Sequence, residues 1–364
     1  MLRDSVVKYV LLVTVSMAAG ALLTLTMLQP QYINFNSSRE MLTLDDLAGE
    51  VTPVSRLRTH NHHPDKIVAL QETQKVRVLC WVLAHPAAHY TKAVHVKATW
   101  GARCDKLIFI SSKNDTKLGA VDIGVGEGRH KLWAKTRAAF TYVYKNYLSE
   151  YDWFYKADDN TYAIMENLHY MLSFYDPNFP IYFGSKYKNG YYRYMSGGAG
   201  YVLSREAVKK FVEEALPNRT ICFQGDTGGE DVMMGACLQN VGVMAGDSRD
   251  SSGRGRFFHI SFTNYLFNEL PGWYTSVIYY KPDTGFNFSS ESAISFHYIE
   301  PRKMYEMEYL LYHLRPQGVS SSHPFPLPLP PDRDCIPPQL LKERGMTSTS
   351  TTDSRKNTSS KNRH

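Results

Sequence analysis

Short apolar runs alternate with amphipathic stretches between residues 76 and 318, and this alternation predicts the elements of one folded unit. Runs rich in β-branched and aromatic residues predict strands at 76–84, 107–111, 153–156 and 181–184. Apolar positions at helical spacing predict helices at 91–100, 131–147, 163–174 and 204–216, the last with Ser204 as its N-cap. Such alternation is typical of an α/β fold, with a mostly parallel sheet and helices on both faces.

An uncharged apolar run at 9–28 precedes this unit. A helix of this length, rising about 1.5 Å per residue, can cross a hydrocarbon core about 30 Å thick. Arg3 and Lys8 stand before the run and no basic residue follows it directly, so the positive-inside rule predicts a lumenal domain. A cleaved signal peptide is the alternative, because small residues at 19–21 resemble a processing site. Under both interpretations the folded unit is extracytosolic.

The segments around the folded unit have the composition of tails and linkers. We expect a cytosolic tail at 1–8, a transmembrane signal-anchor at 9–28 and a polar stem at 29–75. The segment 319–364 is rich in Pro, Ser and Thr and cannot build a core, so we expect it to be disordered. This leaves 76–318 as one domain.

The chain contains 5 cysteines, which fit a lumenal domain with two disulfides and one remaining thiol. Cys80 with Cys104 and Cys222 with Cys237 are the expected pairs, because each pair lies within one stretch of the folded unit. Crossed pairing stays open, and peptide mapping under non-reducing conditions would reveal it.

Composition and charge exclude several classes of protein. Hydrophobic residues at 43% and charged residues at 21% are typical of a globular chain and exclude a wholly disordered or collagen-like one. The net charge is +6, but Lys and Arg outnumber Asp and Glu by only 27 to 24 within 76–318, and by 7 to 4 in the tail. The folded unit therefore lacks the basic stripe that a nucleic acid would require, and we expect no nucleic-acid partner.

The sharpest candidate for chemistry lies where the apolar run at 153–156 meets Asp158, Asp159 and Asn160. Adjacent carboxylates at a strand end concentrate negative charge, and a divalent cation bound to a nucleotide diphosphate would neutralise it. Asp and Asn are equally common in solvated turns, so these residues alone leave both interpretations open.

Three further segments hold candidate residues with similar alternatives. Glu230 and Asp231 follow two glycines at a helix start, where they either complement the helix dipole or bring a general base to a substrate hydroxyl. Glycines at 197, 198 and 200 permit close approach of a ligand or form a tight turn. His297 lies among aromatic residues and is either structural or a ligand.

Longer segments around these features carry a resemblance across nearly all of 76–318. They include Arg77-Val-Leu-Cys-Trp-Val82, Glu127-Gly-Arg129 with Lys135, Trp153 to Tyr162, Met195 to Ser204, Glu230-Asp231-Val232 and Ser295-Phe-His-Tyr298. In this order, on a lumenal chain with an N-terminal anchor, they resemble the core 1 β1,3-galactosyltransferase family. The stem and the tail lie outside the resemblance.

The resemblance implies a GT-A fold and an inverting transfer of galactose from UDP-galactose to O3 of N-acetylgalactosamine (GalNAc) on Ser or Thr. It implies Asp231 as the catalytic base and Mn²⁺ held by Asp158, Asn160 and His297. The implied donor-binding residues are Leu83, Glu127, Gly128, Arg129, Lys135, Asp158 and Asp159. The implied acceptor-binding residues are Glu230, Gly198, Trp273 and Tyr274. GalNAc-bearing glycoproteins are the expected partners and the Golgi membrane the expected location; the oligomeric state stays open, a homodimer included.

Two departures from the family pattern support an alternative function. Asn160 stands where the family has a final Asp, so one negative charge is lost and metal affinity should fall. Asn287-Phe-Ser-Ser replaces a pair of adjacent cysteines, so one family disulfide is expected to be missing and Cys335 to be unpaired or intermolecular. A weak or inactive member acting as a chaperone or binding partner of such a transferase is therefore the alternative. Retention of the other candidate residues favours an enzyme.

Overall fold

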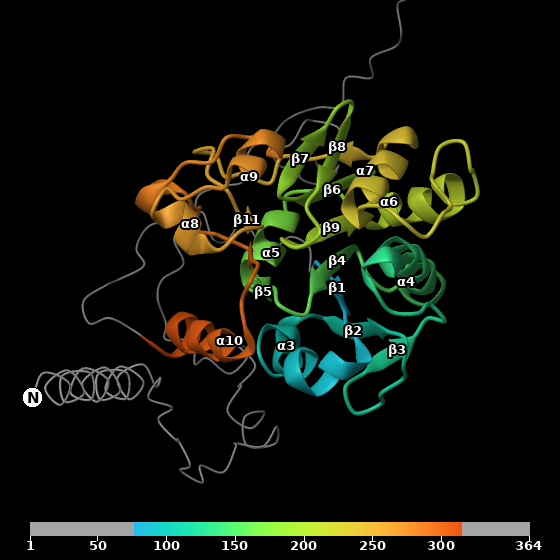
Figure 1. Cartoon of the computed structure of the whole chain (residues 1–364), viewed down its shortest axis with the longest axis horizontal. Coiled ribbons are helices and arrows are strands. Elements are labelled where there is room, and N and C mark those ends of the chain that lie inside the picture. Colours follow the sequence, from blue (N-terminus) through green and yellow to red (C-terminus); the bar gives the residue numbers. More distant parts are fainter. Residues whose placement is uncertain (1–75, 315–364) are drawn as a thin grey trace, which may run out of the picture. The chain divides into compact units, whose positions relative to one another are not determined.

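A mixed seven-stranded sheet runs through the middle of residues 76–314, the part of the chain that the computed structural model describes (Figure 1). The expected segments 1–8, 9–28, 29–75 and 319–364 lie outside these residues, as does Cys335. Within 76–314, no helix combines the length and the hydropathy that crossing a membrane requires.

The strand order of this sheet is β10-β6-β9-β4-β1-β2-β3. Its strands are β1 (Val78–Leu83), β2 (Lys106–Ser111), β3 (Ala120–Asp122), β4 (Trp153–Asp158), β6 (Ile181–Gly184), β9 (Tyr201–Ser204) and β10 (Met244–Ala245). β9 pairs antiparallel with both β4 and β6, and the other neighbours are parallel. The mostly parallel sheet expected from the sequence is therefore present, with one reversed strand.

Two smaller sheets stand beside it. One contains β11 (Phe257–Phe258), β12 (Ser295–Phe296) and β5 (Tyr162–Ala163), and the other is a hairpin of β7 (Lys186–Asn189) and β8 (Tyr192–Met195). Because Tyr162 and Ala163 pair with β12, the predicted helix at 163–174 begins later than expected, at Met165.

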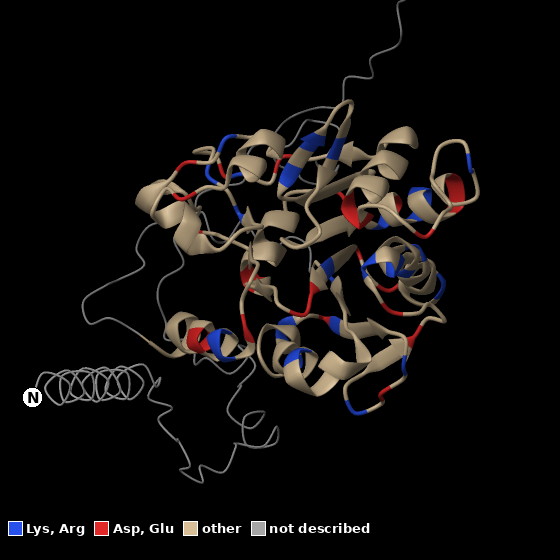
Figure 2. Ribbon diagram, in the orientation of Figure 1, with Lys and Arg blue, Asp and Glu red and all other residues tan. Residues whose placement is uncertain are grey.

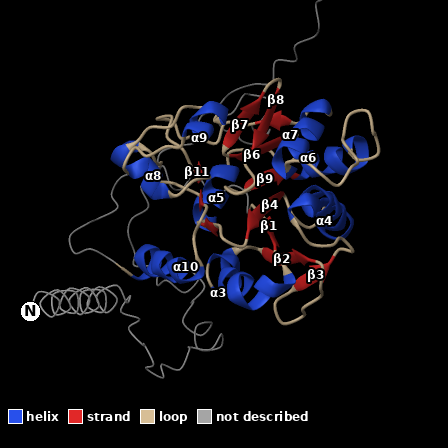
Figure 3. Ribbon diagram, in the orientation of Figure 1, coloured by secondary structure: helices blue, strands red, loops and turns tan. Residues whose placement is uncertain are grey.

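Helices cover both faces of the main sheet (Figures 1 and 3). One face packs against α4 (Leu132–Tyr147), α6 (Arg205–Lys210) and α7 (Glu230–Asn240). The other packs against α3 (Val94–Ala98), α5 (Met165–Leu172) and α10 (Pro301–Glu308). α8 (Phe262–Leu266) and α9 (Gly272–Val277) contribute to a third core cluster, together with residues of the hairpin. Figure 2 shows basic and acidic residues interspersed along the described ribbon.

Side chains of β1 alternate between these two cores. Val78, Cys80 and Val82 pack on the α3 and α5 side, whereas Leu79 and Trp81 pack on the α4 side. A strand that is buried on both faces has no polar side, so its sequence is a continuous apolar run rather than an alternating one.

Both expected disulfides are present, Cys80–Cys104 and Cys222–Cys237. Cys80 lies in β1 and Cys104 follows the turn Trp100–Arg103, so the first bond ties that turn to the central strand. The second joins the loop before α7 to the helix itself.

α5 carries a histidine that contributes to stability in a pH-dependent way. The ring nitrogens of His169 lie 2.8 Å from Asp105 Oδ2 and 2.7 Å from the Met165 carbonyl oxygen, so the protonated ring donates to both. Burial alone would lower the pKa of His169, but these two hydrogen bonds and the negative charges of Asp105 and Glu166 together raise it. The stabilisation is complete below the unfolded pKa of about 6.5 and is lost as pH rises through the folded pKa.

A His169→Asn variant is therefore expected to lose more unfolding free energy at about pH 5.5 than at about pH 8.5. Urea denaturation at the two pH values measures the difference. Equal losses would show that the charge of this ring contributes nothing.

Candidate active site

A cleft of about 680 Å³ opens where β1 and β4 end. The two strands are parallel and in register, with Leu83 opposite Asp158, so their carboxyl ends present side chains to one place. The expected site residues that line the cleft are Leu83, Glu127, Gly128, Arg129, Lys135, Asp158, Asp159, Asn160, Gly198, Glu230, Asp231 and His297.

β4 is longer than predicted and ends at Asp158. Lys156 and Asp158 are two residues apart in this strand, so their side chains lie on the same face. Lys156 is buried, and its Nζ donates a hydrogen bond of 2.7 Å to Asp158 Oδ1. The charge of Asp158 is thus balanced in part by the protein itself, which sequence reasoning did not anticipate. Next to it, burial raises the pKa of Asp159 to about 6, although Lys92 acts in the opposite direction.

A second lysine marks the other side of the cleft. Lys135, on α4, is buried and lies 2.5 Å from Glu127 Oε1. Burial would raise the pKa of Glu127, but the hydrogen bond from Lys135 helps to lower it below its usual value. Arg129 is exposed at the same rim. This pair of cations suits a diphosphate.

The first turn of α7 supplies two carboxylates in different environments. Glu230 is buried, and it accepts hydrogen bonds from the Tyr201 hydroxyl and, at 3.3 Å, from Thr136 Oγ1. Burial raises the pKa of Glu230. Asp231 is half-buried, and its two oxygens accept from the backbone amides of Gly197 (3.0 Å) and Val232 (2.9 Å). Two backbone amides therefore hold the Asp231 carboxylate in one orientation at the cleft.

Close packing around the site requires glycine in the segment 197–200, called the glycine segment below. A Cβ atom on Gly197 would lie 2.6 Å from Glu230 Oε2, and one on Gly198 would lie 2.5 Å from His297 Cε1. Side chains at these positions would displace the residues of the cleft. Gly200, with φ of +76°, makes the turn into β9.

The residues expected to hold Mn²⁺ fit a divalent cation in their chemistry. His297 Nδ1 lies 2.9 Å from the His259 carbonyl oxygen, so Nδ1 carries the proton and Nε2 keeps its lone pair. Burial lowers the pKa of His297 more than nearby Asp158 raises it, which keeps the ring neutral. Asp158 offers a carboxylate and Asn160 an amide. Among residues 76–314, no group of three or more His, Cys, Asp or Glu is placed to hold a metal.

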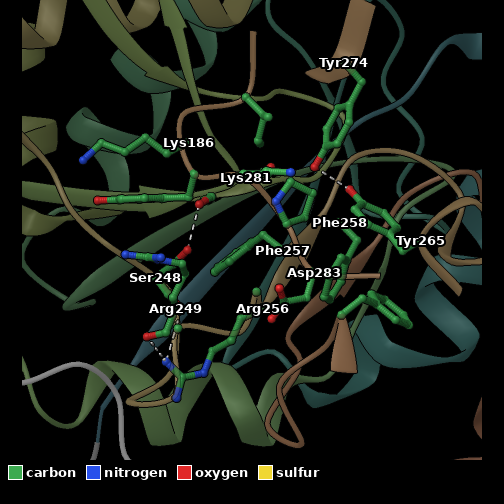
Figure 4. Close-up of a pocket in the computed structure, with 18 residues that line it drawn as sticks. Lys186, Ser248, Arg249, Arg256, Phe257, Phe258, Tyr265, Tyr274, Lys281 and Asp283 are labelled. Carbon is green, nitrogen blue, oxygen red and sulfur yellow. Dashed lines mark hydrogen bonds between the residues drawn. The ribbon is translucent and has the colours of Figure 1, made fainter. Parts of the chain in front are cut away.

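Two expected acceptor residues lie outside the cleft lining. Trp273 is 52% exposed and packs edge-on against His259, with ring centroids 5.7 Å apart. Tyr274 is only 2% exposed, and its hydroxyl accepts a hydrogen bond of 2.8 Å from Tyr265 (Figure 4). Both tyrosines line a second pocket, of about 50 Å³. Tyr274 is therefore a core residue outside the cleft lining, and its role as an acceptor contact stays a prediction.

Sequence reasoning did not assign several residues of the cleft lining to the site, among them Lys156, His259 and Tyr298. His259 is bonded through Nδ1 to the hydroxyls of Tyr187 (2.7 Å) and Ser196 (2.5 Å), and burial lowers its pKa to about 4. Tyr298 is exposed and has φ of 58°, an uncommon value for a residue with a side chain. Lys156 and Tyr298 had a sequence signal, because Lys156 stands two residues before Asp158 in a predicted strand and Tyr298 directly follows His297. His259 had none.

Comparisons with known proteins agree with this geometry. The Fringe-like family model matches residues 85–250, a range that contains Asp158, the glycine segment and Asp231. The match identifies the α/β unit as a Fringe-like, GT-A-type domain.

Individual relatives narrow the assignment. A glycoprotein-N-acetylgalactosamine 3-β-galactosyltransferase 1 from Xenopus laevis is 45% identical over 291 residues, which cover 78% of this chain and 79% of the relative. β-1,3-Glucosyltransferases from Mus musculus and Homo sapiens are 28% identical over 43% and 41% of this chain, and the matches cover 32% and 30% of those proteins. The identity with the first relative, sustained along most of both chains, shows that this protein belongs to the glycoprotein-N-acetylgalactosamine 3-β-galactosyltransferase family.

Proposed function

We propose that this protein transfers galactose from UDP-galactose to O3 of GalNAc linked to Ser or Thr of glycoproteins, with inversion at the sugar carbon. The arrangement of Asp231 and Glu230 opposite Asp158 in one cleft is the observation that supports this most directly. The 45% identity to the Xenopus laevis galactosyltransferase supports the same substrates.

Asp231 is the proposed general base. Inversion requires a single displacement, in which the acceptor O3 attacks the anomeric carbon while the bond from that carbon to the diphosphate oxygen breaks. The O3 proton passes to the Asp231 carboxylate, and UDP leaves with the electron pair. Because backbone amides of Gly197 and Val232 hold this carboxylate, little reorganisation is needed when the proton moves. Buried Glu230 is proposed to orient the acceptor sugar.

The cations at the rim serve the leaving group. Negative charge grows on the diphosphate as the glycosidic bond breaks, and preformed positive charge beside it stabilises it. Lys135 is held in place by Glu127, so its ammonium is already oriented when the donor arrives. Arg129, which is more exposed, is proposed to contact the phosphates from the solvent side.

Mn²⁺ is the proposed cofactor, held by Asp158, Asn160 and His297. When bound, it would supply Lewis-acid stabilisation of the diphosphate oxygens. The amide of Asn160 carries no charge, so the site should bind the ion more weakly than a pair of carboxylates would.

The expected anchor at 9–28 supports a location in the Golgi membrane, with the domain in the lumen. GalNAc-bearing glycoproteins that pass through this compartment are the proposed acceptors.

Turnover tests the proposal directly. The purified full-length chain, given UDP-galactose, Mn²⁺ and a GalNAc-peptide, should release UDP and extend the peptide by one hexose. EDTA should lower the rate about tenfold or more, and excess Mn²⁺ should restore it. No UDP release, together with stable binding to an active transferase of the same family, would instead establish the chaperone alternative.

A further inference from the structure

Lys156 lies between the donor and acceptor sides of the cleft, and the mechanism above leaves it without a role. Its side chain is 2% exposed. Nζ is 2.7 Å from Asp158 Oδ1, 3.0 Å from the Gly197 carbonyl oxygen and 3.9 Å from Glu230 Oε2. One buried ammonium thus faces the proposed metal ligand Asp158 and the proposed acceptor residue Glu230.

The contacts of Lys156 form a continuous path through the site. Lys156 donates to Asp158 on one side and to the carbonyl of Gly197 on the other. The amide of the same glycine donates to Asp231 Oδ2 at 3.0 Å. A single residue, Gly197, therefore separates the lysine from the proposed base.

Lys156 forms an ion pair with Glu230 but no hydrogen bond. Glu230 Oε1 is occupied by Tyr201 and Thr136, whereas Oε2 faces Lys156 at 3.9 Å, an ion pair too long for a hydrogen bond. Asp158, at 2.7 Å, holds the ammonium more closely. The attraction between two charges grows as their distance shrinks. If Asp158 releases the ammonium, Lys156 can move toward Glu230 and attract it more strongly.

We propose that Lys156 is a positioning residue that couples donor binding to acceptor binding. When Asp158 turns to the cation of the bound nucleotide, Lys156 loses this partner and moves closer to Glu230 and the Gly197 carbonyl. Glu230 and Asp231 are then fixed for the acceptor. The inference rests on the proposed function, because it takes Asp158 as donor-side and Glu230 as acceptor-side. By linkage, the acceptor tightens donor binding by the same factor.

Binding without turnover tests the coupling. Isothermal titration of the full-length protein with a GalNAc-peptide, alone and then with saturating UDP and Mn²⁺, gives two dissociation constants whose ratio is the coupling factor. We expect UDP to tighten peptide binding about tenfold in the natural protein. In a Lys156→Met variant the ratio should fall to about one. A ratio that persists in this variant would overturn the proposal.

Lys135→Met is the matched control, because Lys135 is also a buried lysine of the cleft but pairs with Glu127 on the donor side. This variant should bind UDP more weakly and keep the coupling ratio; loss of the ratio here as well would overturn a specific role for Lys156. Lys156→Arg, which retains the charge, should keep part of the coupling.

Removing a buried charge can prevent folding, so thermal unfolding of each variant is measured first. If Lys156→Met does not fold, the natural protein and Lys156→Arg still test the proposal. A ratio of one between the two dissociation constants of the natural protein would overturn it. A natural protein that binds UDP and peptide with no coupling contradicts only this inference, whereas one that binds neither contradicts the proposed function itself.

Discussion

An Asp231→Asn variant is expected to lose about a thousandfold in kcat, because a positioned general base contributes roughly 10²–10⁴ to such a reaction. Asn is nearly isosteric, and its carbonyl oxygen can still accept the hydrogen bond from the Gly197 amide, while only the local bond from the Val232 amide is lost. The glycine segment and the donor side of the cleft therefore keep their structure, and UDP should bind with unchanged affinity. UDP release measures kcat, and isothermal titration measures UDP binding.

Asp283→Asn serves as the control for this variant. Asp283 is exposed and lines the smaller pocket rather than the cleft, so the same change of Asp to Asn should leave the rate unaltered. A near-normal rate for Asp231→Asn would remove Asp231 from the mechanism and leave Glu230 as the remaining carboxylate of α7 at the cleft.

An Arg103→Met variant is expected to lower the free energy of unfolding by about 3–5 kcal/mol, since breaking a buried ion pair leaves the other charge uncompensated. Arg103 pairs with Glu308 at the end of α10, and the two side chains are 9% and 6% exposed. The Tyr162 hydroxyl also donates to Glu308, and the guanidinium lies 3.9 Å from the centre of the Tyr312 ring. The variant would leave a buried carboxylate with the hydroxyl but without its cation. Urea denaturation measures the loss.

Arg77→Met is the matched control for that loss. Arg77 makes a similar pair with Asp152 at 2.9 Å, but its side chain is 42% exposed, and pairs in water contribute about 1 kcal/mol or less. Comparable losses of unfolding free energy in the two variants would mean that burial does not determine how much the Arg103–Glu308 pair contributes to stability.

Local patterns predicted the elements whose stability depends on their own residues. The apolar run of β1 and the amphipathic pattern of α4 lie within a residue or two of their predicted bounds. Ser204 caps α6 as expected, its hydroxyl accepting from the Ala207 amide at 3.1 Å. Such features depend on neighbours in the sequence, so a pattern alone reveals them.

Short strands with distant partners escaped prediction. β9 has four residues and follows the glycine segment, and it exists because β4 and β6 pair with it on both sides. The predicted helix at 163–174 lost its first residue, Ala163, to β5 for the same reason, since the partner strand β12 lies far along the chain. Periodicity over four residues cannot separate a strand from a turn, so the partner strand decides.

The sequence by itself determined the α/β class and the positions at which chemistry was expected, because motifs depend on the order of residues. The tertiary structure decided between the expected and the crossed disulfide pairs. Only the tertiary structure decided which of these positions meet. It brought Asp158, Asp231 and His297 to one cleft and assigned Tyr274 to the core. It also revealed Lys156, whose partner Gly197 is 41 residues away. The physical reason is that burial and charge pairing depend on distances in space, which strand order and register set.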